Sequence, residues 1–172
     1  MEYLPLHFDL REKLCLLVGG GDVALRRATM LVRAGAKVRV VAPAINAELA
    51  ALVESSGSHS RIGRYQSKDM REATLVVAAT DDEALNRQVW RDANKRQLPV
   101  NVVDHADMCT FIFPAIVDRS PVLISLSSSA TSPVLSRKLR EKLESMIPAS
   151  YGRLAEFVGR FRDRIKQSSS RS

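Results

Sequence analysis

The sequence of 172 residues predicts an α/β fold whose first part is a doubly wound parallel sheet. Short apolar runs alternate with helical patterns through the first 103 residues, and a glycine cluster directly follows the first run. Buried strands that alternate with helices are joined by crossovers, which make the strands parallel and cover both faces of the sheet. A glycine turn between the first strand and the first helix is typical of a Rossmann-type half fold.

The glycine cluster lies between a predicted strand over residues 14–18 and a predicted helix over residues 23–34. Gly35 ends that helix, because glycine readily adopts the left-handed conformation of a C-terminal cap. A β-branched run over residues 37–41 forms the second strand, and Pro43 stops it. The remaining elements of this part are a helix over 45–55, an edge strand over 60–65, a helical turn over 67–72, a strand over 74–79, a helix over 81–96 and a strand over 99–103.

The pattern changes after residue 110. Apolar runs over residues 111–118 and 122–127 flank a turn composition at residues 118–121, which predicts a β-hairpin. Ser132 and Pro133 then open a helix that runs to about residue 147, with the serine as its cap. The alternation of strands and helices therefore ends at the hairpin.

A last helix is predicted over residues 149–166, basic and amphipathic, followed by a frayed tail at 168–172. We expect three regions: a dinucleotide-binding domain over residues 1–113, a hairpin-and-helix region over 114–148, and a short helical region with the tail over 149–172. The apolar face of the last helix carries Leu154, Phe157, Val158 and Phe161.

The composition, 45% hydrophobic and 26% charged, is that of a folded chain and excludes wholesale disorder. The net charge of +7 is unevenly spread, since residues 1–132 hold 16 basic and 15 acidic residues while residues 133–172 hold 10 and 4. A protein that coats nucleic acid uniformly is therefore not expected.

Cysteine use and the N-terminus narrow the class of protein further. Cys15 lies in an apolar run and is expected to be buried, and Cys109 has no CxxC or Cys/His partner, so neither a disulfide scaffold nor a metal site is predicted. Neither a signal peptide nor an apolar stretch of the ~20 residues that span a membrane is visible. We expect a cytoplasmic protein with no membrane or nucleic-acid partner.

The glycine turn fits the pattern G-x-G-x-x-A, with Gly19, Gly21 and Ala24 at the defining positions. The first glycine permits the turn, the second lets the backbone approach a pyrophosphate, and the alanine allows close packing of helix and strand. The helix N-terminus offers free N–H groups to phosphates. The pattern predicts dinucleotide binding, against the alternative of a merely structural turn.

The acidic residue that usually closes the second strand and holds the ribose hydroxyls is missing. The sequence there reads Val40-Val41-Ala42-Pro43-Ala44, so a ribose would be held by backbone or by the turn at Pro43 and Ala44. No arginine follows to bind a 2′-phosphate. The choice between NAD and NADP stays open at this point, with NAD favoured.

Polar residues follow the fourth and fifth predicted strands at the edge where ligands bind in such sheets. Thr80 and Asp81 are candidates to contact the cofactor, and one of them could also, or instead, simply cap the next helix. Asp104 can exchange a proton beside the nicotinamide, or it is a solvated loop residue, and His105 competes for the acid–base role through its intrinsic pKa.

Residues 127–132 form a hydroxyl-rich loop before a helix, which is either an anion site or a cap with a flexible linker. We take Ser128, Thr131 and His105 as candidate substrate contacts.

Several strings in register resemble the precorrin-2 dehydrogenase/sirohydrochlorin ferrochelatase family, in particular the N-terminal module of siroheme synthases. The resemblance extends from about residue 4 to residue 147, and its last three strings are far more specific than a glycine motif. The strings lie at residues 4–5, 18–24, 78–82, 101–104, 111–121, and 131–135 with 140–144.

The resemblance implies an NAD-dependent dehydrogenase that aromatises precorrin-2 to sirohydrochlorin, and often also inserts Fe²⁺ to give siroheme. The family's essential aspartate matches Asp104, which would take up substrate protons in both steps. Its cofactor contacts match Asp22 with Val23 and Pro43 with Ala44. The hairpin and the following helix resemble the family's dimerisation region, which implies a homodimer with the Ser128 loop near the substrate.

The chain departs from the family at two places. The hydroxyl loop has Ser129 and Ala130 where the family usually has glycines, and the C-terminal helical region is shorter than usual. A chain of another class, an NAD(H) sensor that binds a partner through its basic C-terminal helix, is the alternative. Four arginines of the basic end could instead steer a substrate rich in carboxylates: Arg137, Arg140, Arg153 and Arg160.

Overall fold

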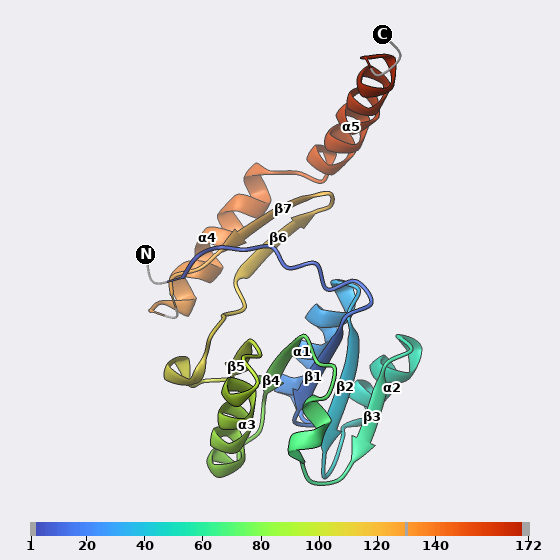
Figure 1. The fold of residues 1–172 in the computed structure, drawn as a ribbon. Coiled ribbons are helices and arrows are strands. Elements are labelled where there is room, and N and C mark those ends of the chain that lie inside the picture. Colours follow the sequence, from blue (N-terminus) through green and yellow to red (C-terminus); the bar gives the residue numbers. More distant parts are fainter. Residues whose placement is uncertain (1–2, 130, 170–172) are drawn as a thin grey trace. The chain divides into compact units, whose positions relative to one another are not determined.

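The computed structural model describes residues 3–129 and 131–169, with side chains through Arg162. The chain forms two compact units, which we call the sheet unit, Tyr3–Ile112, and the hairpin unit, which begins at Phe113. The predicted fold class is confirmed, because a five-stranded parallel sheet with helices is followed by an antiparallel hairpin and further helices (Figure 1).

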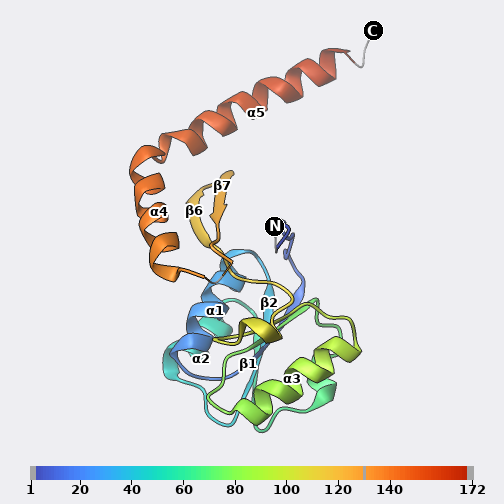
Figure 2. The same cartoon turned by 90° about the vertical axis from the view of Figure 1, so that its left-hand side faces the viewer.

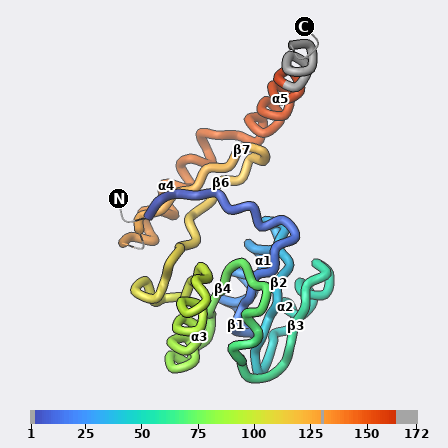
Figure 3. The backbone as a smooth tube through the Cα atoms, in the orientation of Figure 1, coloured from blue at the N-terminus to red at the C-terminus, as the bar shows by residue number. Residues whose placement is uncertain are grey.

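The sheet has the strand order β3-β2-β1-β4-β5. The chain builds outward from β1 to β3, then crosses to the other side of β1 for β4 and β5 (Figure 3). Val18 at the end of β1 is in register with Val41 of β2 and with Ala78 of β4, so three strands end at one level. The strands are β1 (Leu14–Val18), β2 (Lys37–Ala42), β3 (His59–Ile62), β4 (Leu75–Ala78) and β5 (Val100–Val102).

Helices cover both faces of the sheet, with α1 and α2 on one face and α3 on the other (Figure 2). Successive side chains of a strand point to opposite faces. Leu16 and Val18 accordingly pack with Val89 and Ala93 of α3, while Cys15 is fully buried as predicted. The helices are α1 (Asp22–Arg33), α2 (Ala47–Ser55) and α3 (Glu83–Lys95), with 3₁₀ turns η1 (Ser67–Met70) and η2 (Ala106–Met108).

The third strand ends at Ile62 rather than at residue 65, which corrects the predicted strand over 60–65. Gly63 has a positive φ of 146°, which turns the chain out of the strand. Tyr65 then becomes buried, and its hydroxyl donates to Asp92 Oδ2 at 3.0 Å. Burial and this bond raise the pKa of the tyrosine above its usual range. The aromatic residue thus belongs to a buried loop and not to the edge strand.

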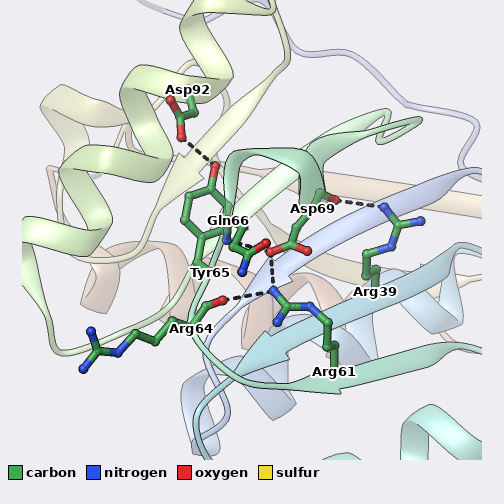
Figure 4. A network of polar contacts seen from close by, with 7 residues as sticks. All are labelled: Arg39, Arg61, Arg64, Tyr65, Gln66, Asp69 and Asp92. Carbon is green, nitrogen blue, oxygen red and sulfur yellow. Dashed lines mark hydrogen bonds and ion pairs between the residues drawn. The ribbon is translucent and has the colours of Figure 1, made fainter.

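A buried carboxylate, Asp69, organises the loop that returns from β3 to the centre of the sheet (Figure 4). Its Oδ2 pairs with Arg61 and accepts from the backbone N–H of Gln66 at 2.7 Å. Arg39 reaches from β2 and donates to the carbonyl oxygens of Asp69 and Arg71, each at 2.9 Å. These bonds satisfy polar groups that the loop would otherwise bury unpaired.

The hairpin is shorter than predicted: β6 comprises Ala115–Arg119 and β7 Val122–Leu126. In the antiparallel register Ala115 pairs with Leu126, the last residue of β7. Residues 111–114 therefore have no partner in β7 and lie outside β6. Helix α4 spans Pro133–Met146, and the Ser132 cap is confirmed, since its Oγ accepts from the N–H of Leu135 at 3.3 Å.

Helix α5 spans Ser150–Ser169. Ser168 and Ser169 are therefore helical rather than part of a frayed tail, and the rest of the predicted tail, 170–172, lies outside the described residues.

Arg119 and Gly152 join the helices to the hairpin. Arg119 donates from Nε to the carbonyl oxygen of Ile147 at 2.7 Å and from Nη2 to that of Glu144 at 3.2 Å, which satisfies carbonyl groups at the end of α4. A Cβ at Gly152 would lie 2.5 Å from the carbonyl oxygens of Arg119 and Ser120, so only glycine lets α5 approach the hairpin turn. None of the helices in the described chain is both long and apolar enough to cross a membrane.

Candidate dinucleotide and acid–base site

The glycine turn between β1 and α1 is held by its neighbours on both sides. The N–H of Gly19 donates to the carbonyl oxygen of Val41 at 3.0 Å, and Gly19 has a φ of 134°. A Cβ at Gly19 would collide with the carbonyl of Ala79 after β4, and a Cβ at Gly20 with the carbonyl of Ala44 after β2. The first two glycines are therefore required by close packing of three sheet-edge turns.

Gly21 is different, because a Cβ there would meet nothing within 4 Å. It is the N-cap of α1 and offers no side chain as a cap, so the first N–H groups of the helix, including those of Asp22 and Val23, are left for water or a ligand. An open backbone at a helix N-terminus fits the pyrophosphate of a dinucleotide. Ala24 is fully buried, as the pattern predicts for close packing of helix and strand.

The turn after β2 is bound to the turn after β1. Pro43 and Ala44 are exposed at this edge. Asn46 donates its backbone N–H to the carbonyl oxygen of Gly20 at 2.9 Å and its Nδ2 to Asp22 Oδ1 at 3.1 Å. The side-chain oxygen of Asn46 also caps α2. Asn46 is not among the site residues predicted from the sequence, although an asparagine before a helical pattern is a recognised cap signal.

The polar residues after β4 have other roles than expected. The cap of α3 is Asp82, whose Oδ1 accepts from the N–H of Leu85 at 3.0 Å, so the predicted cap at Thr80 or Asp81 is wrong. Thr80 Oγ1 instead lies 2.7 Å from the Oδ1 of the buried Asn86, which donates its Nδ2 to the carbonyl of Thr80 at 2.8 Å. Asp81 is exposed at the same edge. A cofactor contact at Thr80 and Asp81 stays a prediction.

Asp104 is exposed in the turn that follows β5 and has a φ of 63°, the left-handed region. Aspartate tolerates this conformation better than most residues with a Cβ. The turn begins where the N–H of Val103 donates to the carbonyl oxygen of Ala78 at 2.9 Å, so Asp104 follows the strand that neighbours β4. Its carboxylate therefore lies at the same sheet edge as the glycine turn.

Cys109 closes the loop that carries Asp104. Its Sγ lies 3.2 Å from the carbonyl oxygens of Val102 and His105 and 3.3 Å from the N–H of Val102. Thr110 then rejoins β5 through two bonds of 2.8 Å to the backbone of Val100. Burial raises the pKa of the Cys109 thiol, which keeps it protonated as a donor in this loop. The sequence offered no signal for this role.

A cation lies near Asp104. Burial lowers the pKa of the Arg27 guanidinium, and the charge of Arg26 lowers it further, whereas the charge of Asp104 opposes that shift. Arg27 belongs to α1, so the glycine helix and the Asp104 turn share one electrostatic environment. His105 is half-buried beside Asp104, and its backbone N–H donates to Val102 at 3.2 Å.

The hydroxyl loop belongs to the hairpin unit. Ser128 is half-buried, and its Oγ contacts the carbonyl and N–H of Ser132, at 3.0 and 3.1 Å, and the hydroxyl of Ser136 at 2.9 Å. Thr131 is exposed, with its N–H bonded to the carbonyl oxygen of Ser128. Ser129 has a positive φ of 50°, in the left-handed region that glycine adopts most readily, and Ala130 lies outside the described residues.

The sheet unit thus brings most of the predicted site residues together at the carboxyl ends of its strands, which is where open α/β sheets bind their ligands. Within the described residues, no group of three or more His, Cys, Asp or Glu side chains could hold a metal ion. The residues gathered at this edge are Gly19, Gly21, Asp22, Val23, Pro43, Ala44, Thr80, Asp81, Asp104 and His105.

A family described as putative NAD(P)-binding matches residues 6–115 of the chain. The chain belongs to this family. The match covers the glycine turn and the Asp104 loop, so the dinucleotide binding predicted from the glycine motif is confirmed.

Similar proteins extend the comparison to nearly the whole chain. It is 53% identical over 167 residues, 97% of its length, to a siroheme synthase of Pseudomonas paraeruginosa, of which it spans 36%. It is 45% identical over 168 residues to a siroheme synthase of Nitrosomonas europaea, of which it spans 35%. The solved structure of SirC, precorrin-2 dehydrogenase, matches with a TM-score of 0.79 and 28% identity over 92% of this chain and 78% of that one. The resemblance predicted from the strings is confirmed.

Proposed function

We propose that the chain catalyses the NAD-dependent dehydrogenation of precorrin-2 to sirohydrochlorin in siroheme biosynthesis. The observation that carries this proposal is the position of Asp104, an exposed carboxylate in a braced turn at the same sheet edge as an open, glycine-capped helix N-terminus. The similarity to siroheme synthases and to SirC supports the choice of substrate.

Dehydrogenation removes two hydrogens from the tetrapyrrole, one with its electron pair as hydride and one as a proton. When bound, NAD⁺ supplies the acceptor for the hydride. Asp104 takes the proton, and because its carboxylate is exposed it can pass that proton to water before the next turnover. The loop closed by Cys109 and Thr110 holds Asp104 in place while the substrate changes.

We also propose Fe²⁺ insertion into sirohydrochlorin as a second activity, with Fe²⁺ as substrate. Metal insertion releases two pyrrole protons, and Asp104, an exposed carboxylate, would take them up in turn. The name siroheme synthase belongs to relatives about three times as long as this chain, so the two steps have to be scored separately.

We propose further that the hairpin unit forms a homodimer, with Ser128 and Thr131 as substrate contacts. Support comes from the apolar side chains that α4 and α5 leave exposed, among them Val134 at 58% and Phe157 at 57%. Exposed apolar surface of this kind marks association sites. A cytoplasmic location stays a prediction.

The test is a coupled assay with NAD⁺ and precorrin-2, followed by Fe²⁺, in which absorbance separates sirohydrochlorin from siroheme. Asp104→Asn should lower the dehydrogenation rate by about 10²-fold or more, because it removes the base, while the affinity for NAD⁺ changes little. Asp107→Asn is the matched control, since Asp107 is an exposed acid three residues further along the same loop.

Full activity of Asp104→Asn would contradict the assignment of the base. Absence of sirohydrochlorin formation by the unmodified chain, together with a steeply salt-dependent affinity for DNA, would favour the sensor alternative.

A further inference from the structure

A cavity of about 380 Å³ lies in the sheet unit, outside the dinucleotide and acid–base site. Residues of β2, of β3 and of the loop from η1 to β4 line it, and none of them belongs to the candidate site described above. Five of the eight lining residues are exposed, so the cavity is accessible from solvent. Its volume lies within the range of about 300–1,000 Å³ that is typical of sites for small organic molecules.

The register of β2 and β3 places basic side chains on one face of the sheet. Arg39 is in register with His59, and Val41 with Arg61. Since alternate residues of a strand share a face, Arg39, His59 and Arg61 lie on the same face. Both arginines bond with Asp69, Arg39 through the backbone carbonyl and Arg61 through the carboxylate (Figure 4). Two strands thus supply three basic side chains to the lining of the cavity.

The positive charge of the cavity exceeds its negative charge. Four arginine and lysine side chains and two carboxylates line it, a surplus of two positive charges, whereas residues 1–132 together have a surplus of one. Asp69 neutralises Arg61. Within the described residues, no carboxylate forms an ion pair with Arg39, Lys68 or Arg71. Their positive charge is therefore available to an anionic ligand.

The two arginines of the strands also keep hydrogen-bond donors that the protein does not use. Arg39 donates to both of its carbonyl partners from Nη1, which leaves its Nη2 without a bond in the described part of the chain. Arg61 donates from Nη2 to Asp69 and to the carbonyl oxygen of Arg64. The Nε–H of Arg61 is buried and has no partner within the described residues. Because an unpaired buried donor costs free energy, it indicates a place where a ligand or a water supplies an acceptor.

We propose that this cavity is a second ligand site, which binds the phosphate group of a small hydroxylated molecule such as a sugar phosphate. A tetrahedral phosphate accepts hydrogen bonds on several sides, which fits donors that come from β2, β3 and the η1 loop, whereas a planar carboxylate accepts them in one plane. Ser60 and Glu72 also line the cavity and can bond with the hydroxyl groups of such a ligand. The site depends neither on the dinucleotide nor on the tetrapyrrole of the proposed function.

The test measures binding of ribose 5-phosphate by calorimetry, with NAD⁺ at saturation so that the glycine turn is occupied. The unmodified chain should bind ribose 5-phosphate, and NMR shifts of backbone amides should locate it at residues 59–61 and 68–72. Arg71→Gln should weaken binding about tenfold, because it removes a charge-assisted contact. The Arg71 side chain is exposed and its structural bond comes from the backbone carbonyl, so the substitution leaves the bond with Arg39 in place.

Arg64→Gln is the matched control. Arg64 is an exposed arginine of the same loop that does not line the cavity, and its side chain extends away from Arg39 and Arg61 (Figure 4). Its substitution removes the same charge and should leave the affinity within about twofold. Thermal unfolding of both variants verifies that the fold is intact.

Equal weakening by the two substitutions would overturn the proposal, since the attraction would then come from the general surface charge. Absence of ribose 5-phosphate binding by the unmodified chain would also overturn it, as would amide shifts confined to residues 19–24. Citrate carries carboxylates only, and its binding as tightly as ribose 5-phosphate would contradict the assignment of a phosphate group.

Discussion

Helices α3 of the sheet unit and α5 of the hairpin unit carry the same kind of amphipathic pattern, but the two patterns end in different surroundings. Val89 and Ala93 of α3 are fully buried against the sheet. Leu154 and Phe157 of α5 are 55% and 57% exposed, and Phe157 packs edge-on against Phe161 of the same helix. Helical periodicity in a sequence therefore identifies which face of a helix is apolar, but it does not identify what covers that face.

Helix α4 extends the contrast, since none of its residues, all within the described chain, is buried. The sheet unit closes its own core, with Leu16, Leu17 and Val77 at 0% exposure. An isolated hairpin with two helices buries little apolar surface, and such small units need a partner to become stable. The two units therefore differ in how much of their apolar surface the described chain buries.

The largest expected effect is on the oligomeric state, when charged residues are introduced into the exposed apolar face of α5. Leu154→Glu combined with Phe157→Glu should convert a dimer to a monomer, because two carboxylates would be buried unpaired in the interface. Analytical ultracentrifugation at micromolar concentration measures the change. Arg160→Glu on the same helix should leave the dimer in place. If the unmodified chain were a monomer, the contrast drawn between the two units would be contradicted.

A smaller effect is expected in the sheet unit at the buried carboxylate Asp69. Asp69→Asn should lower the free energy of unfolding by about 2 kcal/mol, less than a fully buried pair would lose because Arg61 remains 39% exposed. Urea denaturation measures it. Asp9→Asn is the control, because the ion pair of Asp9 with Arg11 is exposed and its loss should not change stability measurably. Equal effects of the two variants would show that burial does not decide the strength of these pairs.

The smallest effect concerns the positive charge of the hairpin unit. Arg153 and Arg160 are exposed, whereas Arg140 is half-buried and paired with Glu144 at 2.9 Å. Arg153→Glu with Arg160→Glu should raise the KM for precorrin-2 about threefold at low salt and less at high salt, since steering by exposed charge is screened. Arg140→Gln should change KM less. A KM independent of salt in every variant would mean that the basic end only faces solvent.

The order and type of the elements could be predicted from the sequence because the signals are local. The apolar run before the glycine cluster, Pro43 after the second strand and the cap at Ser132 each act within a few residues. The exact boundaries were harder to predict, because neighbouring residues offer equivalent local signals. Asp82 rather than Asp81 caps α3, and Thr80 bonds with the buried Asn86 instead. Residues 111–114 lie outside β6, where the hairpin register begins at Ala115.

In the candidate site, too, some residues could be predicted from the sequence, whereas their contacts could not. Gly19, Gly21 and Asp104 could be found from the sequence, because a glycine pattern and a carboxylate after a strand are recognisable where they stand. The partners of those residues come from other elements: Cys109 closes the Asp104 loop, and Asn46 holds Asp22. No spacing in the sequence reports such contacts.

By itself, then, the sequence determined the parallel sheet, the dinucleotide turn and the place of Asp104 after the fifth strand, since these follow from propensity and from the direction of parallel strands. Only the tertiary structure decided that Gly20 is required by the carbonyl of Ala44, that Asp22 faces the turn after β2, and that the apolar face of α5 is uncovered in one copy of the chain. The physical reason is that these features depend on atoms far apart in the sequence, whose approach is set by packing of the whole unit.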